Sequence, residues 1–394
     1  MNTDAAAKRE NPADAGSRAS PNARKPGSGS IWIAWLCRAG FEDDLIEEVS
    51  AWIQDRGSVT ALLREPGMLL LELTSRPGAH LAAPAYADLV FARDQMQVAV
   101  QLSDLDTRDR FGPIEKQLDA LGPLISVTVL AADSDAGKPL APLVRALQAR
   151  VGARANPSAR TAAYVWLVSG TQALIGTQLP GAGAIYPGGI ARLRFPREAP
   201  SRSTLKLDEA FCVLLTQAER DRLLKAGMRA VDLGAAPGGW TYQLVRRHMR
   251  VFAVDNGRMD AQLLQSGLVD HLREDGFRYL PARPVDWLVC DMVEKPAKVV
   301  DLVLKWFKGG HCRAAVFNLK LPMKKRFEAW AKARAALESL AACGHMLRAR
   351  QLYHDREEIT VALIPSASVK PGRTKPPQMK VVNAANGRVG RQRS

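Results

Sequence analysis

The chain has 394 residues, 47% of them hydrophobic, and a formal charge of +15 at pH 7; this length predicts two or three domains, and this composition excludes a wholly disordered chain. No apolar run approaches the roughly 18 residues that a membrane span requires, and no hydrophobic segment near the N-terminus predicts a secretory signal. The five cysteines are scattered without a CxxC spacing, which disfavours a disulfide framework or a structural zinc site, so we expect a cytoplasmic protein without a metal.

The N-terminal half predicts a disordered arm followed by two small domains. Residues 1–30 are rich in Ala, Ser, Pro and Gly and have no periodic apolar positions, a composition typical of disorder. A buried strand and an amphipathic helix open an α+β domain over residues 31–102, and residues 31–135 carry a net charge of −9. A second α/β domain is expected over residues 103–198, and residues 136–199 carry a net charge of +7.

Residues 199–365 predict a third domain with a different pattern. Short apolar runs alternate with helical segments, which indicates a mainly parallel sheet covered by helices on both faces. The last helix, expected over residues 326–342, precedes two strands that a tight polar turn joins, so these strands should pair antiparallel. A mostly parallel Rossmann-like sheet with an antiparallel terminal hairpin is typical of class I methyltransferases. The basic tail over residues 366–394 is expected to be disordered.

A glycine-rich loop follows the first strand of this third domain. It reads Gly234-Ala235-Ala236-Pro237-Gly238-Gly239-Trp240. Glycines let the backbone approach a ligand closely, and the G-x-x-P-G-G spacing differs from the G-x-G-x-x-G of dinucleotide enzymes, which favours a nucleoside that carries a carboxylate. Asp255, after the next strand, is expected to hold ribose hydroxyls, and Asp275 an adenine amino group. NAD and S-adenosylmethionine share the ribose contact, and a glycine turn with solvated aspartates is the simpler alternative.

Four charged residues lie at the ends of elements in the same domain. Lys206 lies in a helix start, Asp291 and Lys320 end apolar strands, and Glu358 opens the last strand. Ligands of open parallel sheets bind beyond the carboxyl ends of the strands, so Asp291 and Lys320 are expected to face the same crevice as the glycine loop. Each of these residues alone is more often a solvated charge, and only their joint placement favours a site.

The glycine loop and these four residues resemble the FtsJ-type ribose 2′-O-methyltransferases and their Lys-Asp-Lys-Glu tetrad. More closely, several stretches resemble the bacterial methyltransferases of a cytidine ribose in the peptidyl-transferase region of 23S rRNA; they are residues 201–207, 231–244, 290–298, 317–325 and 350–358. The resemblance covers about residues 30–365. It implies a ferredoxin-like domain over residues 31–102, a THUMP RNA-binding domain over residues 103–198, and a methyltransferase domain over residues 199–365.

The same resemblance implies S-adenosylmethionine as the cofactor and 23S rRNA as the partner. It places a set of residues at the cofactor: Ser203, Ala236, Pro237, Gly238, Gly239, Asp255, Asp275 and Asp291. Ala236 is a departure, because relatives can have Cys there, but it lines the loop through its backbone.

The chemistry of ribose methylation matches the four charged residues. A ribose hydroxyl is a poor nucleophile near neutral pH, so an enzyme must align it with the sulfonium methyl and help its proton leave. The resemblance implies Lys320 as the proton acceptor, which requires a neutral amine and therefore a lowered pKa. Asp291 and Glu358 raise that pKa, whereas Lys206 and removal from water lower it. The alternative is a charged Lys320 that orients the hydroxyl and stabilises the developing alkoxide.

Basic residues beside these elements predict RNA contacts. Lys324, Lys325 and Arg326 follow the strand that ends at Lys320; three cations at a helix start oppose the helix dipole and need a partner, for which we favour RNA phosphates. Arg192 and Arg194 are expected to continue this basic track. A solvated helix start is the simpler alternative.

Two other functions compete with methyl transfer. An NAD-dependent oxidoreductase predicts G-x-G-x-x-G and has no use for the four charged residues. A non-catalytic rRNA-binding or ribosome-assembly factor with a methyltransferase fold has no need to keep them intact. The sequence does not establish the oligomeric state, for which a monomer is favoured.

Overall fold

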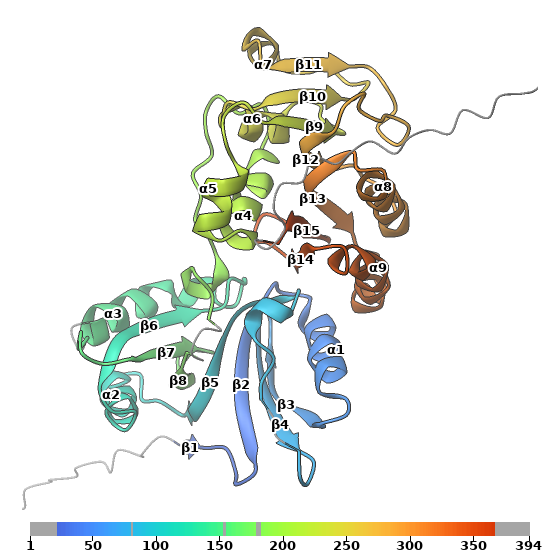
Figure 1. Cartoon of the computed structure of the whole chain (residues 1–394). Coiled ribbons are helices and arrows are strands. Elements are labelled where there is room, and N and C mark those ends of the chain that lie inside the picture. The colour runs from blue at the N-terminus through green and yellow to red at the C-terminus, as the bar shows by residue number, and fades with distance from the viewer. Residues whose placement is uncertain (1–21, 80–81, 153–154, 179–182, 367–394) are drawn as a thin grey trace, which may run out of the picture. The chain divides into compact units, whose positions relative to one another are not determined.

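The computed structural model describes residues 22–79, 82–152, 155–178 and 183–366, which form two compact units divided between Ala191 and Arg192 (Figure 1). The predicted domain boundary, between residues 198 and 199, lies seven residues after this division. The predicted C-terminal tail, beyond Ser366, lies outside the described residues.

The first unit contains one sheet with the strand order β3-β4-β2-β5-β8-β7-β6, and β1 pairs with β5. Its strands are β1 (Asn22–Arg24), β2 (Ser30–Cys37), β3 (Gly57–Glu65), β4 (Met68–Ser75), β5 (Ala92–Ser103), β6 (Leu124–Ala131), β7 (Thr161–Leu167) and β8 (Ala173–Thr177). Its helices are α1 (Glu42–Ile53), α2 (Phe111–Asp119) and α3 (Ala141–Val151), with single 3₁₀ turns η1 (Tyr86–Asp88), η2 (Lys138–Leu140) and η4 (Pro187–Gly189).

The sheet is continuous across residue 102, where two separate domains were expected. The long strand β5 pairs antiparallel with β2 on one side and with β8 on the other. Both neighbours can pair with it because a central strand offers hydrogen-bonding groups along both of its edges. Residues 31–102 and 103–191 are thus parts of one unit, and their ferredoxin-like and THUMP character stays a prediction.

The prediction of disorder over residues 1–30 is wrong for residues 22–30. Asn22, Ala23 and Arg24 pair with β5 near its end at Ser103, and Arg24 lies over the ring of Trp32 with its guanidinium carbon 5.8 Å from the ring centroid. The backbone pairing explains why this polar segment is ordered without apolar periodicity. The part of the predicted arm over residues 1–21 lies outside the described residues.

The second unit is built on a seven-stranded sheet of order β11-β10-β9-β12-β13-β15-β14. Its strands are β9 (Arg229–Leu233), β10 (Arg250–Val254), β11 (Val269–Leu272), β12 (Val285–Cys290), β13 (Cys312–Lys320), β14 (His345–Arg350) and β15 (Glu358–Pro365). Its helices are α4 (Thr204–Leu214), α5 (Gln217–Leu223), α6 (Gly239–Val245), α7 (Ala261–Gln265), α8 (Pro296–Lys308) and α9 (Arg326–Ala341).

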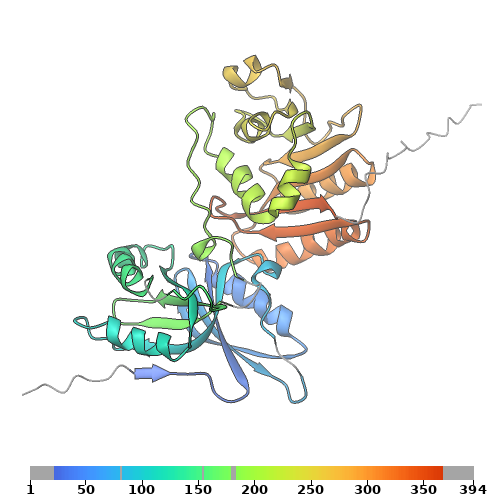
Figure 2. The same ribbon diagram turned by 60° about the vertical axis from the view of Figure 1, so that its left-hand side comes forward.

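This sheet confirms the predicted Rossmann-like methyltransferase layout. Strands β11, β10, β9, β12 and β13 run parallel, whereas β15 pairs antiparallel with both β13 and β14. Helices α4 and α6 cover one face and α8 and α9 the other, as the two views show (Figures 1 and 2). Burial on both faces is why these strands read as continuous apolar runs.

The core of the second unit fixes the sheet beneath the site. Phe211 of α4 packs edge-on against Trp287 of β12, with ring centroids 5.6 Å apart, and the Trp287 indole donates a 2.6 Å hydrogen bond to the carbonyl of Leu223. This cluster anchors the helix that carries Lys206 to β12, the strand that Asp291 follows. Among the described residues, no helix is both long and apolar enough to cross a membrane.

Candidate active site

The structure brings the four predicted charged residues together at the carboxyl ends of β12 and β13. Lys206 Nζ lies 3.3 Å from Asp291 Oδ2, and Lys320 Nζ lies 3.6 Å from Asp291 Oδ1. Both lysines also form ion pairs with Glu358. Two ammonium groups thus alternate with two carboxylates, so that each charge faces two of opposite sign.

Strand register accounts for part of this arrangement. Lys320, the last residue of β13, is the direct cross-strand partner of Glu358, the first residue of β15. Because alternate residues point to opposite faces of a sheet, this register places both side chains on one face. Lys206 reaches the same place from the first turn of α4, whose capping residue is Ser203.

Burial controls the electrostatics of this cluster. The side chains of Lys206, Asp291 and Lys320 are 15%, 17% and 27% exposed, and that of Glu358 is 4% exposed. Removal from water lowers the pKa of Lys320, Asp291 raises it, and Lys206 lowers it further; the net direction is down. The balance that the sequence left open therefore favours the neutral amine relative to an exposed lysine.

The glycine loop lies beside Asp291, as expected from the sheet order. Gly234 and Gly238 adopt positive φ angles of 76° and 120°, which side chains with a Cβ rarely adopt, and the peptide between Ala236 and Pro237 is cis. A Cβ on Gly234 would lie 2.6 Å from Cγ of Met292, and a Cβ on Gly239 would collide with the hydroxyl of Ser203. The loop therefore needs its glycines, and Ser203 packs directly against it.

The two predicted aspartates of the cofactor site make different local contacts. Asp255, just after β10, accepts hydrogen bonds from the backbone N–H groups of Ala236 (3.0 Å) and Gly257 (2.6 Å), so its carboxylate borders the glycine loop. Asp275 accepts a 2.9 Å bond from the Phe277 N–H in the turn after β11. This glycine cradle with a bordering carboxylate matches a nucleoside cofactor, which Asp255 and the loop backbone would hold.

We expect Gly238→Ala to weaken cofactor binding. A Cβ there would meet the side chain of Leu263 and would require a strained φ, so the loop must move. Strain of this kind is worth about 1–3 kcal/mol, which predicts a loss of about tenfold or more in affinity for S-adenosylhomocysteine by calorimetry. Gly227→Ala is the control, because Gly227 also has a positive φ, of 79°, but has open space around it. Equal affinity in the two variants would contradict this role of the loop.

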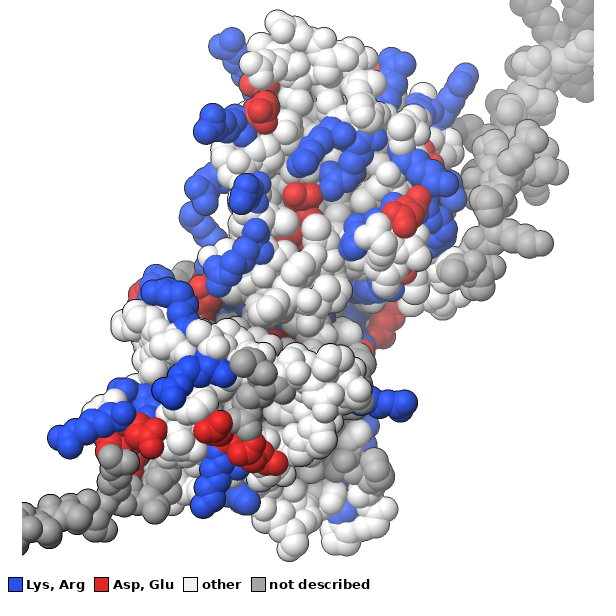
Figure 3. All heavy atoms as spheres, turned by 90° about the vertical axis from the view of Figure 1, so that its left-hand side faces the viewer, with Lys and Arg blue, Asp and Glu red and all other residues white. Residues whose placement is uncertain are grey.

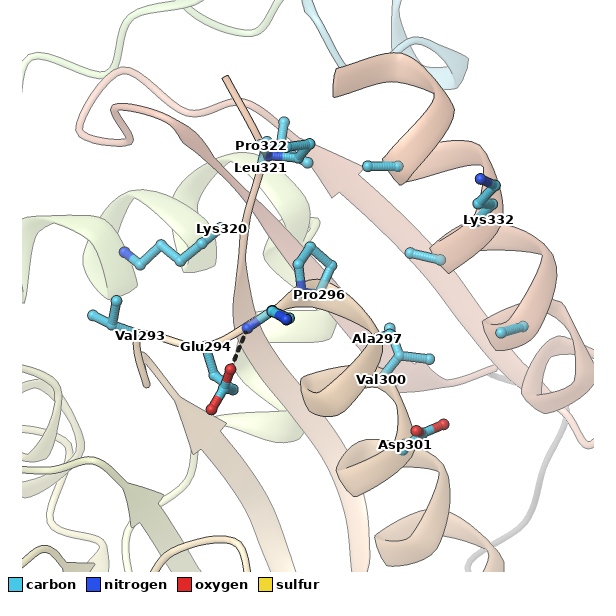
Figure 4. A pocket seen from close by; sticks show the side chains of 14 residues that line it. Val293, Glu294, Pro296, Ala297, Val300, Asp301, Lys320, Leu321, Pro322 and Lys332 are labelled. Carbon is cyan, nitrogen blue, oxygen red and sulfur yellow. Dashed lines mark hydrogen bonds between the residues drawn. The ribbon is translucent and has the colours of Figure 1, made fainter. Parts of the chain in front are cut away.

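An apolar cavity of about 670 Å³ opens beside Lys320, between α8 and α9 (Figure 4). Pro296, Ala297 and Val300 of α8 and Leu321 and Pro322 after β13 line it, and Lys320 lies at one end. By the sheet order, the cavity and the glycine loop are on opposite sides of Asp291. The four charged residues therefore lie between the glycine loop and this cavity.

Two apolar side chains near this centre are unusually exposed. Val293 follows β12, Met323 follows β13, and each is 85% exposed. Sequence reasoning missed both, because single apolar residues in loops carry no periodic signal.

Two of the predicted RNA-binding cations pair with carboxylates of the protein. Lys324 and Lys325 are exposed, but Lys325 Nζ lies 3.3 Å from Glu328, and Arg326 forms a 3.1 Å ion pair with Glu357. Carboxylates of the protein thus offset part of the conflict with the dipole of α9. Arg192 and Arg194 are exposed at the start of the second unit. On the face drawn in Figure 3, basic side chains are scattered over the surface, so their RNA contacts stay a prediction.

Sequence reasoning also missed polar residues behind the charged cluster. Asn318 in β13 donates a 2.8 Å hydrogen bond from Nδ2 to Asp291 Oδ1, and Thr360 and Asp355 lie behind it. For Asn318 and Thr360, the only signal in the sequence is a polar residue inside an apolar strand. Among the described residues, no cluster of His, Cys, Asp and Glu could hold a metal ion.

Comparisons with known proteins agree with this geometry. The FtsJ-like methyltransferase family model matches residues 199–332. The ribosomal RNA large subunit methyltransferase M of Xanthomonas oryzae pv. oryzae is 44% identical over 341 residues, 82% of this chain and 96% of that protein. The protein of the same name from Xanthomonas euvesicatoria pv. vesicatoria is 44% identical over 84% of this chain and 98% of its own length. The chain therefore belongs to the ribosomal RNA large subunit methyltransferase M family of S-adenosylmethionine-dependent rRNA methyltransferases.

Proposed function

We propose that this protein methylates the ribose 2′-hydroxyl of a cytidine in 23S rRNA, in the peptidyl-transferase region, with Lys320 as the proton acceptor. The observation that carries the proposal is the half-buried Lys320, whose pKa is lowered by burial and by Lys206, at one end of the apolar cavity. A nitrogen base held in this way suits removal of the hydroxyl proton as the oxygen becomes the nucleophile.

Each charged residue has a distinct task in this mechanism. S-adenosylmethionine supplies an activated methyl group. Lys320 accepts the proton of the 2′-hydroxyl at Nζ as the oxygen becomes a nucleophile. Asp291 holds both lysines through its two oxygens, and Glu358 pairs with both from the opposite strand. Lys206 keeps a positive charge near Lys320, so the amine loses its proton more readily and the developing negative charge on oxygen is stabilised.

The surroundings of Lys320 support a nucleotide as the second reactant. The apolar cavity and the exposed side chains of Val293 and Met323 border the charged cluster, and apolar surfaces of this kind can contact the face of a base. We further propose that Lys324, Lys325, Arg192 and Arg194 contact phosphates, that Arg326 does so at its exposed edge, and that residues 103–191 add affinity for RNA.

The decisive experiment is to incubate the full chain with labelled S-adenosylmethionine and protein-free 23S rRNA, and then to map ribose methylation. Methyl transfer to one cytidine 2′-oxygen is the expected result. Methyl groups on a base, or on the ribose of another nucleotide class, would refute the proposed position, and RNA binding without any transfer would favour a non-catalytic assembly factor.

We expect the double variant Lys324→Ala/Lys325→Ala to bind 23S rRNA more weakly and with a smaller salt dependence. Each lost phosphate contact reduces the slope of log affinity against log salt by about 1. The control is Lys305→Ala/Lys308→Ala, which removes the same charge from the last turn of α8, just before β13 begins, whereas Lys324 and Lys325 follow the end of β13. Filter binding over a range of salt concentrations measures both slopes; equal slopes for the two double variants would exclude the phosphate contacts.

A further inference from the structure

Behind Asp291, three fully buried side chains form a continuous hydrogen-bonded series. Asn318 donates to Asp291 Oδ1 at 2.8 Å, and the hydroxyl of Thr360 lies 2.8 Å from Asn318 Oδ1. The same hydroxyl lies 3.1 and 2.9 Å from the two oxygens of Asp355. Asn318 and Thr360 are cross-strand partners in β13 and β15, and Asp355 lies in the turn that precedes β15.

The number of protons available in this series determines which group donates each hydrogen bond. A threonine hydroxyl has one proton, yet it faces two acceptors, the Asn318 carbonyl oxygen and the Asp355 carboxylate. The conflict disappears if Asp355 is protonated and donates to Thr360 Oγ1, so that Thr360 can donate to Asn318. Burial raises the pKa of Asp355 to about 7, so the protonated form is available near neutrality.

We propose that Asp355, Thr360 and Asn318 form a positioning relay that fixes the Asn318 amide and thereby holds Asp291 between the two lysines. In the relay, each group donates to the next, from Asp355 through Thr360 and Asn318 to Asp291. The effect on methyl transfer rests on the proposed function, but the effect on Lys320 does not.

Loss of the Asp355 proton is expected to loosen the relay. An ionised carboxylate attracts the Thr360 proton more strongly than an amide oxygen does, so Thr360 turns away from Asn318. The amide then loses the bond that sets its orientation, and a flipped amide would direct its oxygen at the Asp291 carboxylate. Other charges also act on Asp355: Glu209 raises its pKa and Lys206 lowers it, both from α4. Lys320 on β13 also interacts with Asp355, while His354 in the same turn is bound to Glu209.

The first test measures Lys320 without any RNA. Thr360→Val removes the hydroxyl at constant shape, and Thr360→Ser keeps it. Without the Asn318 bond, the charge of Asp291 acts on Lys320 with less competition, so the pKa of Lys320 should be higher in Thr360→Val than in Thr360→Ser. NMR titration of ¹³C-labelled lysines, in full-length protein with S-adenosylhomocysteine and with Lys320→Arg for assignment, measures this pKa. Equal values in the two variants would overturn the relay.

The second test uses methyl transfer and the matched Asp355 variants. Asp355→Asn keeps a permanent donor toward Thr360, so kcat at neutral pH should stay within about twofold of the unmodified protein. Asp355→Ala and Thr360→Val should lower kcat about tenfold, the value of one hydrogen bond, with KM for S-adenosylmethionine unchanged. A loss in Asp355→Asn equal to that in Asp355→Ala would overturn the relay, because the donor would then be irrelevant.

These two tests separate the relay from the proposed function. If the unmodified protein transfers no methyl group to RNA but Thr360→Val still raises the pKa of Lys320, the relay stands and the proposed function falls. If Thr360→Val does not fold, Thr360→Ala takes its place in the same NMR titration; a higher Lys320 pKa than in Thr360→Ser is expected, and an equal one would overturn the relay.

Discussion

Lys320→Met is expected to lower the rate of methyl transfer by about 10²–10⁴, the usual contribution of a general base. Methionine keeps an unbranched apolar stem but lacks the amine, so it has no group that can accept the proton. Affinity for S-adenosylhomocysteine should not change, because the glycine loop and Asp255 do not contact this side chain in the described structure. Single-turnover transfer from labelled S-adenosylmethionine to 23S rRNA measures the rate, and calorimetry measures the affinity.

Two controls make this result specific. Lys332→Met changes an exposed lysine that lines the same cavity and pairs with Glu328 at 2.8 Å, so its rate should stay near that of the unmodified protein. Lys320→Arg keeps the positive charge but cannot release a proton in the accessible pH range. A rate in Lys320→Arg as low as in Lys320→Met supports the proton acceptor; substantial activity in Lys320→Arg would instead support a charged Lys320 that stabilises the alkoxide.

Lys206→Met is expected to move the pH profile of methyl transfer to higher pH. Below its pKa, Lys320 is an ammonium and cannot accept a proton, so the rate rises as pH rises through that pKa. Lys206 lowers this pKa, and its removal leaves two carboxylates facing one ammonium, so the pKa of Lys320 must rise. For each increase of one in that pKa, the neutral fraction below it falls about tenfold, which is the expected loss of rate near neutrality.

The control for this prediction is Lys206→Arg, which retains the charge between Asp291 and Glu358. Its rising limb should lie closer to that of the unmodified protein than the limb of Lys206→Met does. The rate of Lys206→Met should also recover at alkaline pH, because the neutral amine is then populated again. If the pH–rate profile of Lys206→Met keeps its midpoint and only its maximal rate falls, Lys206 acts by positioning its neighbours and not through the pKa of Lys320.

The sequence predicted the site well where chemistry coincides with the ends of elements. Asp291 and Lys320 end apolar strands, and in a parallel sheet the ends of neighbouring strands must meet, so their proximity follows from the pattern. The pairing of Lys320 with Glu358 is harder to predict from the sequence, because it depends on the register of β15 against β13. Register depends on long-range packing, which no local pattern in the sequence reveals.

Other features were hidden for similar reasons. Asn318 and Thr360 look like minor interruptions of apolar strands until their cross-strand pairing is known. Met292 looks like an ordinary loop residue, yet its side chain lies against both Gly234 and Gly276. In the first unit, the continuous sheet was missed because β5 pairs with strands from both predicted domains, a tertiary contact with no trace in composition.

The position of Glu358 at the start of the final strand has a consequence for protein synthesis. Lys206, Asp291 and Lys320 leave the ribosome before β15 does, so the nascent second unit holds two lysines with one carboxylate until β15 inserts between β13 and β14. Insertion brings Glu358 to Lys320 and neutralises the excess charge in one step. Under the proposed mechanism, methyl transfer requires arrival of the last strand, and a chain that ends before residue 358 is expected to be inactive.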